Sequence, residues 1–150
     1  MTDRIWYSRA QGDATPVIHM EIQGNASYRQ TFEFHEIDAN NADVSGGERD
    51  FTAWDADEFR LVFSATLGGA AISGATLTGT DIKVSGDPTG GLLLVRATTT
   101  QTAALETHLE AAGKVSRGAV YGRLYGVDGN GDTITLANAH VRVQFGSVAA

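Results

Sequence analysis

The chain has 150 residues, 42% of them apolar and 19% charged, which fits one globular domain spanning residues 1–150. Its formal charge of −7 opposes binding to nucleic-acid phosphates or anionic membranes, and its eleven basic residues are scattered along the sequence. Cysteine is absent, which excludes disulfides and thiolate metal sites.

The N-terminal half predicts short strands. Residues 17–22 and 28–37 alternate apolar and polar side chains, the period of half-buried strands, and the Gly-Asn turn between them predicts a hairpin. Residues 38–47, rich in Asp, Asn and Gly, predict a surface loop. A further strand is expected at residues 59–65, and we expect at least one nearby aromatic side chain to anchor this region to the core.

The C-terminal half predicts one helix among strands. Residues 92–95 are continuously apolar, as in a buried strand, and a helix near 100–112 is capped by threonines and ended by Gly113. Segments 119–127, 133–136 and 141–145 predict a three-stranded meander. About eight strands in all predict an all-β fold, an immunoglobulin-like or Greek-key β-sandwich.

One loop has the spacing of a calcium site. Asp128, Asn130 and Asp132 place oxygen ligands at every second position, as at the start of an EF-hand loop. An EF-hand would also need a bidentate glutamate seven residues later, where the chain has Ala139. The alternative is a hairpin turn that uses glycine at positive φ.

Catalytic patterns are not found in the sequence. Asp55 and Asp57 are too close together to form a glycosidase pair unaided, and an acidic solvated turn is the simpler interpretation. The four histidines lack the local pairing typical of zinc hydrolases, and no serine lies in a nucleophile elbow. We therefore predict no enzyme activity and no cofactor.

Aromatic residues are the candidates for binding. Trp54, in a predicted loop, and Tyr121 and Tyr125, on one predicted strand face, could stack on sugar rings or pack against a protein. Tyr121 and Tyr125 could equally form ordinary cross-strand contacts.

The order of strands and turns from Phe59 onward resembles a known family. It contains, in order, residues 59–65 (FRLVFSA), 72–77 (ISGATL), 81–84 (DIKV), 87–95 (DPTGGLLLV), a Thr-started helix, 121–128 (YGRLYGVD), 131–136 (GDTITL) and 141–143 (VRV). This resembles the immunoglobulin-like N-terminal domain of upper baseplate, fibre-adaptor proteins of tailed bacteriophages. Residues 12–17 (GDATPV) are similar to the opening of such domains.

The resemblance implies a non-enzymatic structural protein located in the virion. It would dock onto other virion proteins of the tail, baseplate or capsid, and a homo-oligomer or symmetric assembly is expected. A capsid-decorating protein of the same fold is a close alternative. A carbohydrate-binding module, with a glycan as partner, is the alternative from another class, and an enzyme comes third.

Overall fold

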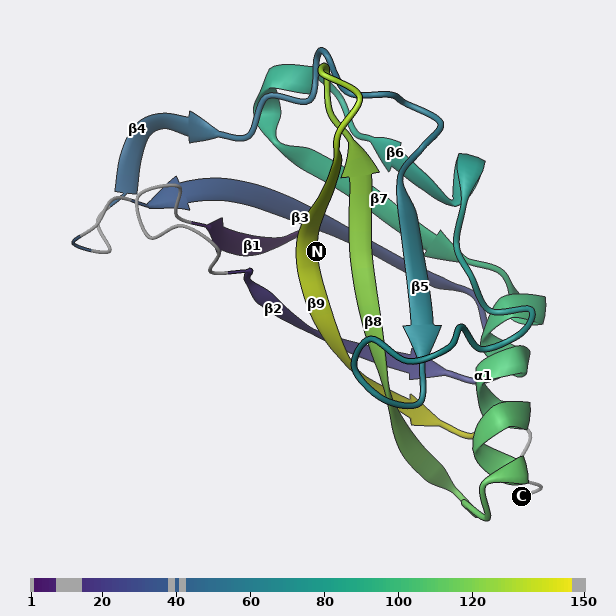
Figure 1. Cartoon of the computed structure of the whole chain (residues 1–150). Coiled ribbons are helices and arrows are strands. Elements are labelled where there is room, and N and C mark those ends of the chain that lie inside the picture. Colours follow the sequence, from purple (N-terminus) through teal and green to yellow (C-terminus); the bar gives the residue numbers. More distant parts are fainter. Residues whose placement is uncertain (1, 8–14, 38–39, 41–42, 147–150) are drawn as a thin grey trace.

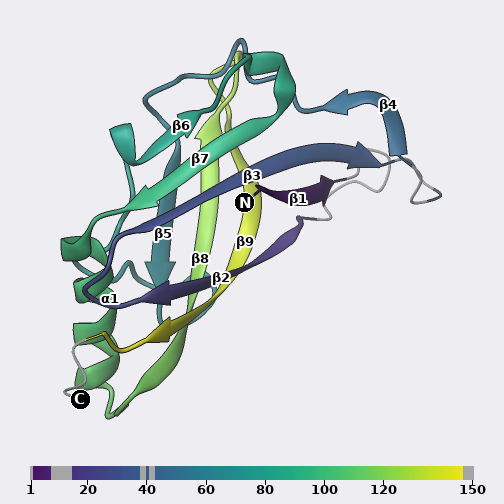
Figure 2. The ribbon, with the colours of Figure 1, turned by 180° about the vertical axis from the view of Figure 1, so that it is seen from behind.

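A computed structural model describes residues 2–7, 15–37, 40 and 43–146, which form two facing β-sheets with one helix at an end (Figures 1 and 2). Sheet A contains β1 (Thr2–Tyr7), β3 (Tyr28–Ile37), β4 (Asp43–Glu48), β6 (Ile82–Val84) and β7 (Leu92–Ala97). Sheet B contains β2 (Val17–Gln23), β5 (Arg60–Ser64), β8 (Arg117–Val127) and β9 (Thr133–Gln144), in the order β2-β9-β8-β5. The predicted all-β sandwich is confirmed, as is the helix, α1 (Thr99–Ala111).

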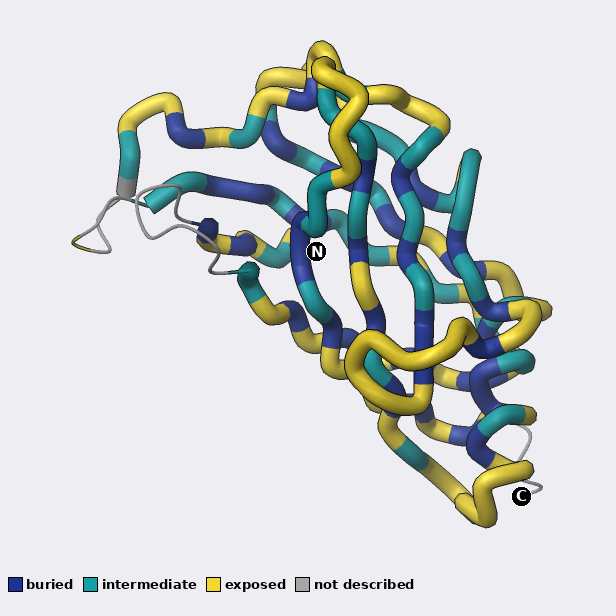
Figure 3. Tube along the Cα trace, viewed as in Figure 1, coloured by how far each residue is buried: buried dark blue, intermediate teal, exposed yellow. Residues whose placement is uncertain are grey.

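The core fills the space between the sheets. Buried and exposed residues alternate along the strands, so each strand turns one set of side chains inward (Figure 3). Phe51 makes edge-to-face contacts with Phe34 of β3 and with Phe59, which directly precedes β5, at centroid distances of 6.1 and 5.6 Å. Trp54 stacks on Phe59. This aromatic cluster joins the two sheets and anchors the segment before β5, as predicted.

The predicted hairpin of residues 17–22 and 28–37 is wrong, because β2 and β3 lie in different sheets. β2 instead pairs in parallel with β9 along its whole length. After β2 the backbone N–H of Gly24 still donates to the carbonyl of Gln144, at 2.8 Å, and Asn25 then turns the chain with a φ of 59°. A turn signal predicts a change of direction, but the distant partner decides which sheet the next strand joins.

The loop predicted at residues 38–47 is also partly wrong, since β4 begins within it. Residues His35 and Ile37 of β3 pair with Glu48 and Asp43 of β4 across a bulge. Backbone groups form this pairing, and the mostly polar, Gly-rich sequence of β4 does not reveal it. Residues 38–39 and 41–42 of the predicted loop lie outside the described residues.

Residues 117–144 form two long strands instead of the predicted meander. β9 continues through Asn138 and Ala139, which lie between the predicted segments 133–136 and 141–145. A bulge shifts the register of β8 against β9, and both Leu136 and Ala137 are buried there. The bulge thus places two consecutive residues on the core side and interrupts the alternation within one continuous strand.

Helix α1 covers the end of the sandwich at which β8 begins (Figure 1). It starts in a capping box, in which Thr98 Oγ1 accepts from the N–H of Gln101 and Gln101 Oε1 accepts from the N–H of Thr98. Leu105 and Leu109 are buried against the strands, and Gly113, with a φ of 87°, follows the last turn. Within the part of the chain that the structure describes, no helix has the length and apolarity to cross a membrane.

Strand β8 carries a glycine at every second inward position. A Cβ on Gly118 would lie 2.7 Å from Leu109 of α1, and one on Gly126 would lie 2.8 Å from Phe59. At Gly122 the nearest side chains are 3.1 Å away. Helix and core therefore approach the β8 backbone closely, which fixes the face that this strand turns outward.

Gly90 and Gly91 allow a test of how tightly the loops pack at the end of the sandwich opposite α1. Gly91 has a φ of 71°, and a Cβ there would lie 2.6 Å from the carbonyl oxygen of Phe34 and 2.9 Å from the nitrogen of Arg49. We expect Gly91→Ala to lower the free energy of unfolding by about 2–4 kcal/mol, measured by chemical denaturation. Gly90→Ala is the control, because a Cβ there meets no atom within 4 Å. It should change that free energy by less than about 1 kcal/mol, and equal losses in both variants would contradict the packing.

Candidate functional site on the outer face of sheet B

The outer face of sheet B consists of the alternate side chains that its four strands turn away from the core. Strand register aligns them in rows across the sheet, from β2 through β9 to β8 and β5. The rows are Gln23–Gln144–Arg117, Glu21–Arg142–Ala119, His19–His140–Tyr121–Ser64 and Val17–Asn138–Arg123–Val62. Segments far apart in the sequence thus form one polar surface, on the side of the molecule nearer the viewer in Figure 1.

A row of rings crosses the middle of this face. The ring of Tyr121 meets that of His140 edge to face, with centroids 5.4 Å apart, and His140 meets His19 in the same way at 5.6 Å. Tyr121 is half-buried and His140 is exposed. The neighbouring rings hold Tyr121 in place, so the row offers ring edges and polar atoms in a fixed arrangement.

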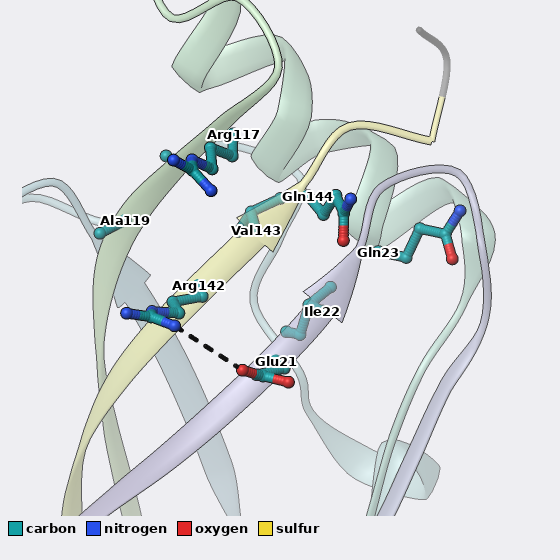
Figure 4. Close-up of a pocket in the computed structure, with 9 residues that line it drawn as sticks. Glu21, Ile22, Gln23, Arg117, Ala119, Arg142, Val143 and Gln144 are labelled. Carbon is teal, nitrogen blue, oxygen red and sulfur yellow. Dashed lines mark ion pairs between the residues drawn. The ribbon is translucent and has the colours of Figure 1, made fainter. Parts of the chain in front are cut away.

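Positive charge gathers on the same face. The four strands carry Arg60, Arg117, Arg123 and Arg142, and their single acidic residue is Glu21. Arg142 and Glu21 approach to 4.0 Å between Nη1 and Oε1, with side chains 84% and 83% exposed (Figure 4). An ion pair this exposed contributes little stability, so the guanidinium can bind another carboxylate. Basic residues scattered in the sequence are therefore brought together by the fold.

The face is hollowed along its length. A hollow of about 720 Å³ lies among Glu21, Arg117 and Arg142, flanked by Gln23 and Gln144 (Figure 4). A second, of about 440 Å³, follows along the row of rings, and a third, of about 600 Å³, lies between the loop at residues 67–69 and the start of β9. Charged and amide groups line the largest hollow, so its chemistry suits a polar, hydrogen-bonding partner more than a small apolar ligand.

The structure separates the three aromatic residues predicted to bind. Tyr121 and Tyr125 both lie on the outer face of sheet B, four residues apart on β8. Trp54 packs on the core side, with its ring stacked on Phe59 at 6.0 Å and the Arg49 guanidinium 5.1 Å from its centroid. The two tyrosines share a surface, and Trp54 belongs to the packing of the loop before β5.

The predicted calcium loop forms the turn between β8 and β9. Asp128 Oδ1 accepts hydrogen bonds from the backbone N–H groups of Asn130 and Asp132, both at 3.0 Å. Gly131 follows with a φ of 80°. One carboxylate oxygen of the predicted ligand set thus holds the turn. Among the described residues, no three His, Cys, Asp or Glu side chains lie close enough together to hold a metal ion.

Sequence reasoning missed the arginines and the histidine pair. The alternation of Tyr121, Arg123 and Tyr125 placed these three side chains together, and extending it back to Arg117 would have added one more. The approach of His19 to His140 depends on the parallel pairing of β2 with β9. No local pattern signals that pairing, because the two strands are more than a hundred residues apart.

No protein-family model and no curated protein sequence matches the chain significantly. Among solved structures, the chain is similar to the N-terminal domain of phage TP901-1 ORF48, with 13% sequence identity and a TM-score of 0.37. The match covers 97% of this chain and 98% of that one. At this TM-score the likeness carries no argument about fold or function.

Comparing two aromatic truncations tests the separation of Trp54 from the tyrosines. Trp54→Ala removes a ring stacked between the core and Arg49, so we expect the free energy of unfolding to fall by about 2–4 kcal/mol. Tyr125→Ala removes an outward side chain and should cost about 1 kcal/mol or less. Denaturant unfolding monitored by circular dichroism measures both. A larger loss for Tyr125→Ala than for Trp54→Ala would contradict these assignments.

Proposed function

We propose that this chain is a non-enzymatic structural protein of a tailed-phage virion that docks onto a neighbouring virion protein through the outer face of sheet B. The observation that carries the docking role is the concentration of arginine, tyrosine and histidine side chains on one hollowed sheet face. Arginine and tyrosine are enriched at protein interfaces, where they supply much of the binding energy. Tyr121 and Tyr125 would lie near the centre of such an interface.

Strand edges support the same role. Within the described residues, β1 and β2 lie at the margins of their sheets, and no strand pairs with their outer edges. The opposite margin of sheet B is partly covered, because Leu77 and Ala71 form isolated bridges to β5. An open edge offers backbone donors and acceptors to an added strand, a common mode of protein docking. A partner on the outer face of sheet B would thus reach the β2 edge too.

The assignment to a phage particle rests on the order of strands and turns that resembles the immunoglobulin-like domain of baseplate proteins. Under this proposal the protein is located in the virion, at the tail or baseplate or as a capsid-decorating subunit. Its partners are other virion proteins, arranged with the symmetry of the particle. The fold supports this role by presenting one broad sheet face and open strand edges.

Co-sedimentation with phage particles tests this proposal. Particles made from the genome that encodes the chain should contain it in fixed stoichiometry after purification. The double variant Tyr121→Ser/Tyr125→Ser should lower its incorporation at least tenfold, because two aromatic contacts are lost from the interface. Quantitative mass spectrometry of the particle fraction provides the measurement.

The matched control is Arg29→Ser/Arg96→Ser, two exposed side chains paired across the outer face of sheet A. It should be incorporated like the unaltered chain. A chain that stays in the soluble fraction while particles assemble normally would overturn the virion role. Glycan-array binding that the tyrosine variant loses would instead identify a carbohydrate-binding module.

A further inference from the structure

The loops of residues 49–59, 85–91 and 128–132 lie at one end of the sandwich, at the top of Figure 1, and their sequences carry seven carboxylates. The backbone joins these loops, since Phe51 N donates to the Pro88 carbonyl and Asp55 N to that of Val127. We call this region the acidic end; its carboxylates are those of Asp50, Asp55, Asp57, Glu58, Asp87, Asp128 and Asp132.

The nearby cations only partly neutralise the acidic end. Lys83 lies 3.4 Å from Asp57 and Arg60 lies 3.2 Å from Glu58, both in exposed pairs. Hydrogen bonds from the Thr52 side chain and backbone hold the pKa of Asp50 below its ordinary value. Arg49 also lies nearby, 5.1 Å from the centroid of the Trp54 ring, so seven carboxylates face three cations and the acidic end keeps net negative charge.

Positive charge lies at the opposite end of the sandwich, where β8 begins. Lys114, Arg117 and Arg142 define this basic end, where β8 begins beside α1 (Figures 1 and 4). Val115, 84% exposed, adds an apolar contact beside them. Glu21 is the acidic residue of the four strands, and α1 carries Glu110 and the buried Glu106, which accepts a hydrogen bond from Asn25.

The two ends do not screen each other. Arg117 and Asp128 lie at opposite ends of β8, and eleven residues of strand span roughly 35 Å. The Debye length in physiological salt is about 8 Å, so each end presents its own charge to solvent. An approaching molecule therefore meets a basic surface at one end and an acidic surface at the other.

We propose that the partner of the basic end is the acidic end of a second copy of this chain, in a head-to-tail contact. This inference rests on the proposed function and names the partner of the outer face of sheet B, to which Arg117 and Arg142 belong. A two-fold contact through the basic end would bring like charges together, whereas a head-to-tail contact pairs opposite charges. Such a contact is heterologous, so its repetition closes into a ring or extends as a filament.

Analytical ultracentrifugation of charge-reversed variants tests the head-to-tail contact. The unaltered chain should self-associate at high micromolar concentration in about 20 mM salt, and dissociate in about 300 mM salt, which screens the contact. Arg117→Glu/Arg142→Glu and Asp57→Lys/Asp132→Lys should each weaken association at least tenfold. An equimolar mixture of the two variants should associate again. The first variant keeps an unaltered acidic end and the second keeps an unaltered basic end, so opposite charges can still meet.

Arg29→Glu/Arg96→Glu provides a control with the same change in net charge on the outer face of sheet A, and it should associate like the unaltered chain. A chain that stays monomeric at every concentration and at low salt would overturn the head-to-tail contact. So would a mixture of reversed variants that fails to associate. The particle assay with the tyrosine variants is independent of this result, so incorporation without self-association would leave the docking role standing and assign the face to a different protein.

Discussion

The close approach of the core to strand β8 is the constraint on which the rest of the structure depends. Inward glycines on this strand let Leu109 of α1 and Phe59 reach the backbone, and a side chain at these positions would displace one or the other. Because strand side chains alternate, fixing the inward set also fixes the outward set. The position of Tyr121 and of the arginines beside it therefore follows from how tightly the opposite face packs.

Much of the fold could be predicted from local patterns. Alternation located β2, β5 and β8, and the capping threonines together with Gly113 located the helix. The errors have separate causes: the partner of β2 lies far away in the sequence, a bulge interrupts the alternation of β9, and β4 is polar. The turn at Gly24 gave no information about β9, and the polar composition of β4 concealed its backbone pairing with β3.

The candidate site was predictable only in part, because its residues come from several strands, some of them far apart in the sequence. Tyr121 and Tyr125 could be placed together because they lie on one strand, but the neighbouring charges come from other strands. For Trp54 the sequence suggested exposure, because this residue lies in an acidic segment. In the structure its ring packs on Phe59. Net charge also fails to describe this surface: the chain carries −7, while the charged side chains on the four strands of sheet B are arginines except for Glu21. Binding depends on the local distribution.

The parallel pairing of β2 with β9 has a consequence for biosynthesis. β9 is an inner strand of sheet B, between β2 and β8, and the ribosome must add over a hundred residues after β2 before β9 is complete. At about 5–20 residues per second, β2 waits on the order of ten seconds for its neighbour. Sheet B closes only after this interval, so nascent chains on one polysome lack the outer face through which finished molecules would meet. Under the proposed head-to-tail contact, assembly would therefore wait until translation has passed Gln144.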